Sequence, residues 1–157
     1  NIFGCTIRFA KRIGSITNGT QVAISSAVKE LLPKNVLQSN EQWMMLLPPQ
    51  DEALLELFFD KLEENWQDTE FNVPDYCQAM AMSQSQLYRK TRALSGFSPN
   101  TLLKEFRLDK AKWLMKKQRY NISQVTFESG FTSPSYFTKC FKNKYGLLPM
   151  AYLDLLG

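Results

Sequence analysis

The sequence contains no histidine and only three cysteines. It therefore lacks the commonest general base, the commonest zinc ligand and any catalytic triad that needs imidazole. Cys5, Cys77 and Cys140 are widely separated and match no zinc-binding or redox spacing, so we expect buried thiols rather than a disulfide framework or a metal site. These absences argue against an enzyme, and we predict no catalytic residue, no cofactor and no metal.

Long apolar runs are missing as well. No stretch approaches the roughly 20 residues that span a bilayer, and residues 1–4 do not resemble the start of a secretory signal. We therefore expect no membrane segment in this chain and a cytoplasmic location. Because the first residue is Asn1 and not Met, we also expect the chain to be part of a longer protein.

Charge is distributed unevenly along the chain. Residues 1–50 carry 5 basic and 2 acidic side chains, residues 51–70 carry 1 and 8, and residues 71–157 carry 13 and 5. A polyanion would bind the basic C-terminal part. With 44% hydrophobic and 22% charged residues, the composition is that of a globular protein.

The basic part contains an internal repeat. Residues 71–73 (Phe-Asn-Val) recur at 120–122 (Tyr-Asn-Ile), an offset of 49, and positions from Ser83 to Pro99 recur 50 residues later. Each copy has the pattern of a short helix, a tight turn and a longer helix, so the sequence predicts helix-turn-helix units at about 72–96 and 121–146. The expected N-caps are Asn72, Ser83, Asn121 and Ser133, the expected helix ends are Gly96 and Gly146, and Gly130 is expected at positive φ.

Two further helices are predicted beside these units. Ser98 opens a helix to about Lys117 whose apolar residues occupy most of its circumference, which favours a linker helix clamped between both units. Residues 51–66 have helical apolar spacing and an acidic first turn, and this helix should cover the first unit. Its carboxylates form either a solvated face or a surface for a partner.

The first 50 residues are predicted to be a separate part. We expect a helix over Thr6–Ile13, a strand over Thr20–Ile24, a capped helix over Ser25–Leu32 and a linker over 36–50. Residues 1–35 are too few to bury their own core, so this α/β segment either is the remnant of a preceding domain or packs on the rest. The predicted fold class is therefore mainly all-α: a double helix-turn-helix domain over 51–157, preceded by a short α/β segment.

The second helix of a helix-turn-helix enters the major groove of DNA, so its outward side chains should be polar or basic. The outward arcs of the two second helices coincide through the repeat. For base contacts we predict Ser85, Tyr88, Arg89, Ser135, Thr138 and Lys139, and for phosphate contacts Arg92, Lys142 and Lys144. Arg89 is the best candidate for a bidentate contact to guanine. There are two alternatives. These residues are only the solvated faces of helices, or the domain binds protein and not DNA.

Several short sequence motifs occur along the chain in the same order as these predicted helices. They include residues 121–125 (Asn-Ile-Ser-Gln-Val), 129–137 (Ser-Gly-Phe-Thr-Ser-Pro-Ser-Tyr-Phe), 145–149 (Tyr-Gly-Leu-Leu-Pro) and an Arg-Leu-x-x-Ala run at 107–111. Residues 71–153, with the acidic helix from about 51, resemble the DNA-binding domain of the AraC/XylS family of bacterial transcription regulators. Thr126 and Pro134 depart modestly from the family pattern.

This resemblance implies seven helices, with two recognition helices in successive major grooves, about 34 Å apart. It implies a transcription regulator, an activator that recruits RNA polymerase, with double-stranded DNA as its partner. A homodimer, if one forms, is expected to use regions outside this chain. Residues 86–90 (Gln-Leu-Tyr-Arg-Lys) and the acidic lead-in look most like output domains of two-component sensor regulators.

Residues 1–34 resemble the C-terminal part of class III nucleotide cyclase domains, through the stretches 4–13, 19–25 and 28–32. The resemblance implies a transition-state role for Arg12, but Arg8 replaces the family's asparagine and the metal-binding carboxylates are absent from this segment. We therefore expect no cyclase activity. The alternative function is a degenerate cyclase-linked regulator with residual nucleotide binding in this segment.

Overall fold

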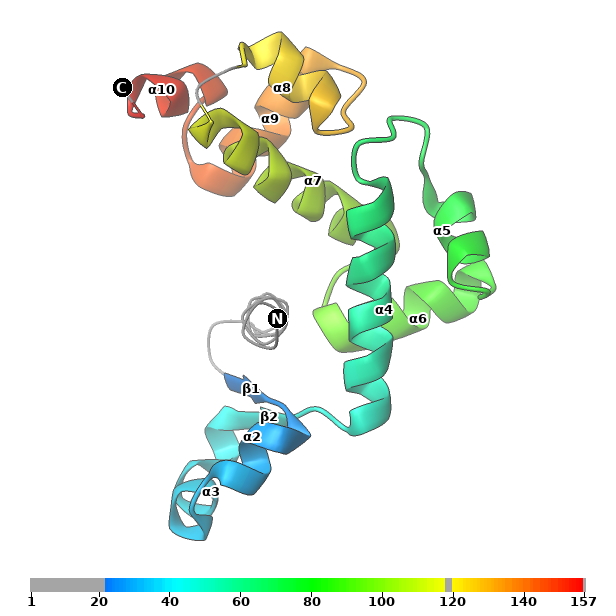
Figure 1. Cartoon of the computed structure of the whole chain (residues 1–157), viewed down its shortest axis with the longest axis vertical. Coiled ribbons are helices and arrows are strands. Elements are labelled where there is room, and N and C mark those ends of the chain that lie inside the picture. The colour runs from blue at the N-terminus through cyan, green and yellow to red at the C-terminus, as the bar shows by residue number, and fades with distance from the viewer. Residues whose placement is uncertain (1–21, 118–119, 157) are drawn as a thin grey trace. The chain divides into compact units, whose positions relative to one another are not determined.

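The computed structural model describes residues 22–117 and 120–156 (Figure 1). The expected helix over Thr6–Ile13 and most of the cyclase-like segment lie outside these residues. The chain divides into two units, which are described separately below. Unit 1 contains residues 22–61 and 77–98 of the described chain, and unit 2 contains residues 62–76, 99–117 and 120–156.

The described residues form two short strands, one 3₁₀ helix and nine α-helices. In chain order these are β1 (Val22–Ile24), α2 (Ser26–Leu31), α3 (Lys34–Asn40), η1 (Glu41–Trp43), β2 (Met44–Leu46), α4 (Pro49–Asn65), α5 (Val73–Ala79), α6 (Gln84–Ser95), α7 (Pro99–Lys116), α8 (Ile122–Glu128), α9 (Pro134–Tyr145) and α10 (Pro149–Asp154). The mainly α-helical fold is confirmed, and α4 to α10 are the seven helices that the family resemblance implied. Within the described ranges, no helix is both long enough and apolar enough to span a bilayer.

The start of unit 1 is a two-stranded parallel sheet in which Val22 pairs with Met44 and Ile24 with Leu46. The predicted strand and capped helix are confirmed, since the Ser25 hydroxyl accepts a hydrogen bond from the Val28 amide (3.2 Å). The predicted linker over 36–50 is wrong. This stretch contains most of α3, all of η1 and β2, and the start of α4, because residues 44–46 pair with β1 and Pro49 opens a helix, where its missing N–H costs nothing.

The second helix of the first helix-turn-helix, α6, has the predicted caps. The Ser83 hydroxyl accepts from the Gln86 amide (3.3 Å) while the Ser83 amide donates to Gln86 Oε1 (3.0 Å), which completes a capping box. Gly96 ends the helix at φ 72°. In the turn before α6, Ala81 takes φ 50°, and its counterpart in the repeat, Gly130, takes φ 81°.

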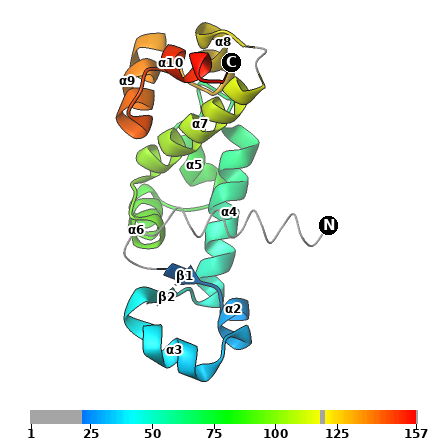
Figure 2. The ribbon, with the colours of Figure 1, turned by 90° about the vertical axis from the view of Figure 1, so that its left-hand side faces the viewer.

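In unit 2, α8, α9 and α10 are grouped near the C-terminal part of α7 in both ribbon views (Figures 1 and 2). Asn121 forms a capping box with Gln124 at the start of α8, Ser133 caps α9 with Pro134 in its first turn, and Gly146 ends α9 at φ 79°. These predicted caps are confirmed. The core consists of Trp66, Leu108, Ala111, Leu114, Met115, Val125, Phe131, Phe137, Cys140 and Phe141.

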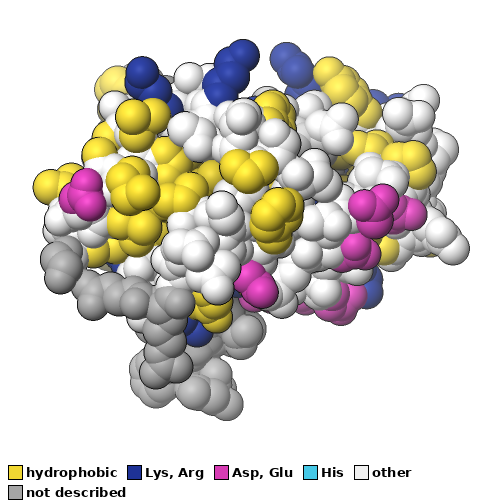
Figure 3. All heavy atoms as spheres, turned by 90° about the horizontal axis from the view of Figure 1, so that it is seen from above, with side chains coloured by type: hydrophobic (Ala, Val, Ile, Leu, Met, Phe, Trp, Pro, Cys, Tyr) yellow, Lys and Arg dark blue, Asp and Glu magenta, His cyan; other side chains and the backbone are white. Residues whose placement is uncertain are grey.

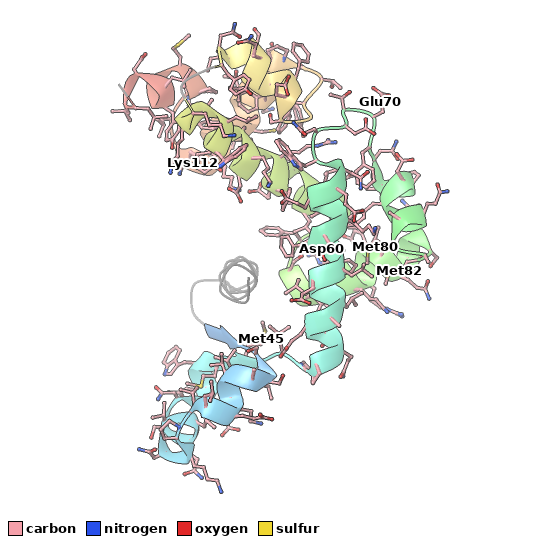
Figure 4. All side chains as sticks on the ribbon, in the orientation of Figure 1. Met45, Asp60, Glu70, Met80, Met82 and Lys112 are labelled. Atoms are coloured by element: carbon pink, nitrogen blue, oxygen red, sulfur yellow. The ribbon has the colours of Figure 1, made fainter. Side chains whose placement is uncertain are left out.

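The central helix α7 buries most of its circumference, as its sequence predicted. The buried residues include Leu102, Leu103, Leu108, Ala111, Leu114 and Met115. Trp113 is the exception, because its side chain is 49% exposed and the Lys117 ammonium lies 3.6 Å from its ring centroid. On the same helix, Lys112 (labelled in Figure 4) lies over the rings of Tyr145 and Tyr152, at 4.7 Å and 5.4 Å.

Candidate nucleic-acid interface

Helix α6 presents a polar arc to solvent. Its opposite arc is anchored by Leu87 and Thr91, both fully buried, and the Thr91 hydroxyl donates to the Leu87 carbonyl (2.7 Å). The exposed residues of the arc are Ser85, Tyr88, Arg89 and Arg92. Arg92 Nη1 donates to the Tyr88 hydroxyl (3.5 Å), whereas within the described residues no hydrogen bond or ion pair engages the Arg89 guanidinium. The Arg89 side chain is exposed.

Helix α9 has the same division. Phe137 and Phe141 are fully buried in the unit 2 core, with ring centroids 5.6 Å apart. The opposite arc contains Ser135, Lys139 and Lys142, which are exposed, and Thr138, which is half-buried. The aromatic core fixes the rotation of α9 about its axis, and this rotation keeps the polar arc outside.

Lys144 does not belong to this arc. Its ammonium pairs with Glu105 (3.0 Å) and Asp109 (2.8 Å) of α7 and donates to the Glu105 carbonyl (3.0 Å). The repeat gives the reason, because Lys144 corresponds to Leu94, which lies on the inward side of α6. Lys144 was predicted to contact phosphate because it is a basic residue near the end of the helix. That prediction did not consider its position on the circumference of α9, and we leave Lys144 out of the interface.

Tyr136 is a surface residue of α9 that was not among the predicted base contacts. Its side chain is 54% exposed, and its ring lies 6.2 Å from the buried Phe131 ring. A hydrogen bond with the Cys140 side chain, together with burial, raises the pKa of Tyr136. The signal that could have found it is its angular position on the wheel, between Lys139 and Cys140, at the border of the two arcs.

Arg107 holds the turn before α9 against the loop that follows α4. Its Nε donates to the Trp66 carbonyl (3.1 Å), and its Nη2 donates to the carbonyls of Asp68 (2.6 Å) and Phe71 (3.2 Å). Gly130 lies directly beside this guanidinium. Burial lowers the pKa of Arg107, an effect that the charge of Asp68 opposes. The arginine of the Arg-Leu-x-x-Ala run is thus a structural clamp within unit 2.

Hydrophobic side chains and Lys and Arg side chains are both exposed on the face shown in Figure 3. In unit 2 the large exposed hydrophobic residues are Trp113, Phe127, Tyr136, Leu148, Met150 and Leu155. For the residues that the structure describes, no cluster of acidic and cysteine side chains is arranged to hold a metal ion, and Cys77 and Cys140 are free thiols.

Comparison with known proteins places this arrangement in a family. A family model described as a helix-turn-helix domain matches residues 76–154, half of the chain. The chain belongs to the AraC-type helix-turn-helix family. In this AraC-type domain, α5 and α6 are the helices of the first helix-turn-helix, and α8 and α9 are those of the second.

Two relatives with similar sequences illustrate the similarity of the AraC-type domain. Histidine kinase P4 of Formosa agariphila is 37% identical over 102 residues, which are 65% of this chain and 7% of that protein. The HTH-type transcriptional regulator MtrA of Neisseria gonorrhoeae is 32% identical over 99 residues, which are 63% of this chain and 31% of that protein. The chain thus spans less than a third of either relative.

Among solved structures, the DNA-binding domain of the global transcriptional factor AdpA, in complex with a target DNA, matches with a TM-score of 0.60. The match has 27% identity and covers 65% of this chain and 90% of that chain. The comparisons give no support to the resemblance of residues 1–34 to nucleotide cyclases. Arg12, to which that resemblance gave a transition-state role, and Arg8, which departs from the pattern, lie outside the described residues.

Proposed function

We propose that this chain is the sequence-specific DNA-binding part of a transcription regulator, with α6 and α9 as its two recognition helices. The observation that supports this most is the matched pair of polar arcs. Ser85, Tyr88, Arg89 and Arg92 on α6 recur as Ser135, Thr138, Lys139 and Lys142 on α9, each opposite a buried face. A structural requirement for the core explains the buried faces but not the repetition of exposed cations at matching positions.

Within each arc, we propose that some side chains contact bases and others contact phosphates. The planar fork of Arg89 matches O6 and N7 of guanine, and such a bidentate contact discriminates between bases by about 1–3 kcal/mol. Lys139 occupies the corresponding place on α9. Arg92 and Lys142, one turn further along, are proposed to contact phosphates, which position a helix without specifying sequence. We propose half-sites about 34 Å apart, one turn of B-DNA.

The wider role extends beyond this chain. The relatives named as a transcriptional regulator and as a histidine kinase support an output domain that is controlled by a sensory part. We further propose that this output domain helps to position RNA polymerase. The 37% identity to a histidine kinase makes a two-component pathway the favoured source of the signal.

A mobility-shift experiment on DNA selected by the chain tests the proposal. Arg89→Ala should relax the preference for one guanine by roughly 5- to 150-fold. Arg92→Ala and Lys142→Ala should instead weaken binding to all sequences and each lower the slope of log affinity against log salt by about 1. Lys116→Ala is the matched control, because this exposed lysine of α7 lies outside both arcs. Binding that ignores sequence, or an unchanged footprint for Arg89→Ala with Lys139→Ala, would reject the proposal.

A further inference from the structure

The two polar arcs match in position but differ in the chemistry of their side chains. Where α6 has Gln86, Tyr88 and Arg89, α9 has Tyr136, Thr138 and Lys139. None of the twelve residues of α9 is an arginine. A lysine ammonium is a flexible point charge, and it selects bases with less geometric precision than the arginine fork. Discrimination by α9 must therefore come mainly from its other exposed side chains.

Tyr136 and Thr138 give α9 an apolar border. Tyr136 is 54% exposed, and its ring rests beside Phe131, which is itself 5% exposed and lies 5.2 Å from the Phe137 ring. The ring is thus supported by the core from one side and open on the other. Thr138 adds a half-buried methyl group. In the major groove, the C5-methyl group of thymine is the apolar group that such side chains contact.

Resting on the function proposed above, we propose that α9 recognises a half-site containing thymines, through Tyr136 and the methyl group of Thr138, whereas α6 recognises a half-site containing guanine. The Tyr136 ring packs beside Phe131, and its exposed side is left for the base. Lys139 then supplies attraction to the groove, and Lys142 supplies a phosphate contact. The operator is consequently asymmetric.

The test uses the whole chain and a DNA duplex selected by it from a random pool. The half-site whose guanine preference relaxes in Arg89→Ala belongs to α6, and the other belongs to α9. Replacing thymines of the α9 half-site with uracil removes only the methyl groups. Each contacted methyl should cost roughly three- to fivefold in affinity, as expected for one buried methylene. The same replacement in flanking DNA is the control.

Protein variants separate the methyl group from the hydroxyl. Thr138→Val keeps a methyl group and should retain the preference for thymine over uracil, whereas Thr138→Ser should lose part of it. Tyr136→Phe should behave as the original chain, and Tyr136→Ser should lose the preference at one position. A selected α9 half-site without thymine, or uracil and thymine duplexes bound equally, would overturn this inference while leaving the proposed function intact. Failure to select any sequence would instead reject the proposed function.

Discussion

Gly130 shows at the residue scale how tightly the second helix-turn-helix is joined to the rest of unit 2. A β-carbon at this position would lie 2.1 Å from the Trp66 carbonyl oxygen and 2.6 Å from Arg107 Nε. The same residue takes φ 81°, a left-handed conformation that side chains disfavour. The turn, the Arg107 clamp and the loop after α4 therefore meet where there is no space for a methyl group.

The substitution Gly130→Ala should lower the free energy of unfolding by about 3 kcal/mol or more, because it combines backbone strain with a clash against a carbonyl oxygen. Gly146→Ala is the matched control. Gly146 has φ 79°, and no described atom lies within 4 Å of its added β-carbon, so it should lose only about 1 kcal/mol. Urea unfolding of both variants decides the matter, and equal losses would contradict the packing described for the turn.

Tyr145 is the residue through which unit 2 should become sensitive to alkaline pH. Burial raises its pKa well above the usual value near 10, and a hydrogen bond from its hydroxyl to Asp109 (2.7 Å) acts in the same direction, as do the charges of Asp109 and Glu105. The folded protein therefore holds this proton more tightly than the unfolded chain. Burial alone raises the pKa of Tyr76 in the same way.

Stability contributed by these protons is complete below pH 10 and is lost as the pH rises above 10, where the unfolded chain releases them first. Each such tyrosine steepens the loss by up to about 1.4 kcal/mol per pH unit. Tyr145→Phe should therefore flatten the fall in unfolding free energy between pH 10 and 11.5. A profile for Tyr145→Phe as steep as that of the unsubstituted chain would show that its proton is not held by the fold.

At the scale of the elements, the two helix-turn-helix units share the same pattern of capping residues and differ at one position in the turn. Both second helices have a serine N-cap and a left-handed glycine at the end. The turn position at positive φ is Gly130 in the second unit but Ala81 in the first. Alanine is less suited to this conformation than glycine, so the first turn contains backbone strain that the second lacks.

The replacement Ala81→Gly should relieve this strain and raise the free energy of unfolding by about 0.5–1 kcal/mol. Ala93→Gly is the opposite case on the same unit, because Ala93 lies within α6 and is exposed, so glycine there should cost about 1 kcal/mol. Differential scanning calorimetry of the two variants would register shifts of opposite sign. A loss of stability in Ala81→Gly would mean that φ 50° is not a strained state for this turn.

The caps, turns and apolar periodicity of α4 to α10 could be predicted because each depends on residues close in sequence. The pairing of residues 44–46 with β1 could not, since strand pairing depends on a partner some 20 residues away and the Pro48-Pro49 pair suggested a linker. The ion pairs of Lys144 and the exposure of Tyr136 could not be predicted for a related reason. A side chain at the border of a helix face is placed by its tertiary neighbours, here the carboxylates of α7 and the Phe131 ring.

For the molecule as a whole, acidic and basic side chains are concentrated in different stretches of the chain, and the basic stretch contains the two proposed recognition helices. Residues 51–70 carry 8 acidic side chains and residues 71–157 carry 13 basic ones, so the acidic helix start and the DNA-binding helices belong to different stretches of the chain. Part of the acidic stretch is used internally, since Glu63 pairs with Lys110 of α7.

Selection of bound sequences from a random DNA pool tests the central claim most directly, because it depends on both recognition helices at once. The account predicts a motif of two half-sites whose centres are about ten base pairs apart, one of them containing a guanine that Arg89→Ala no longer prefers. Recovery of a single short half-site, or of no enriched sequence at all, would contradict the claim that α6 and α9 bind successive major grooves.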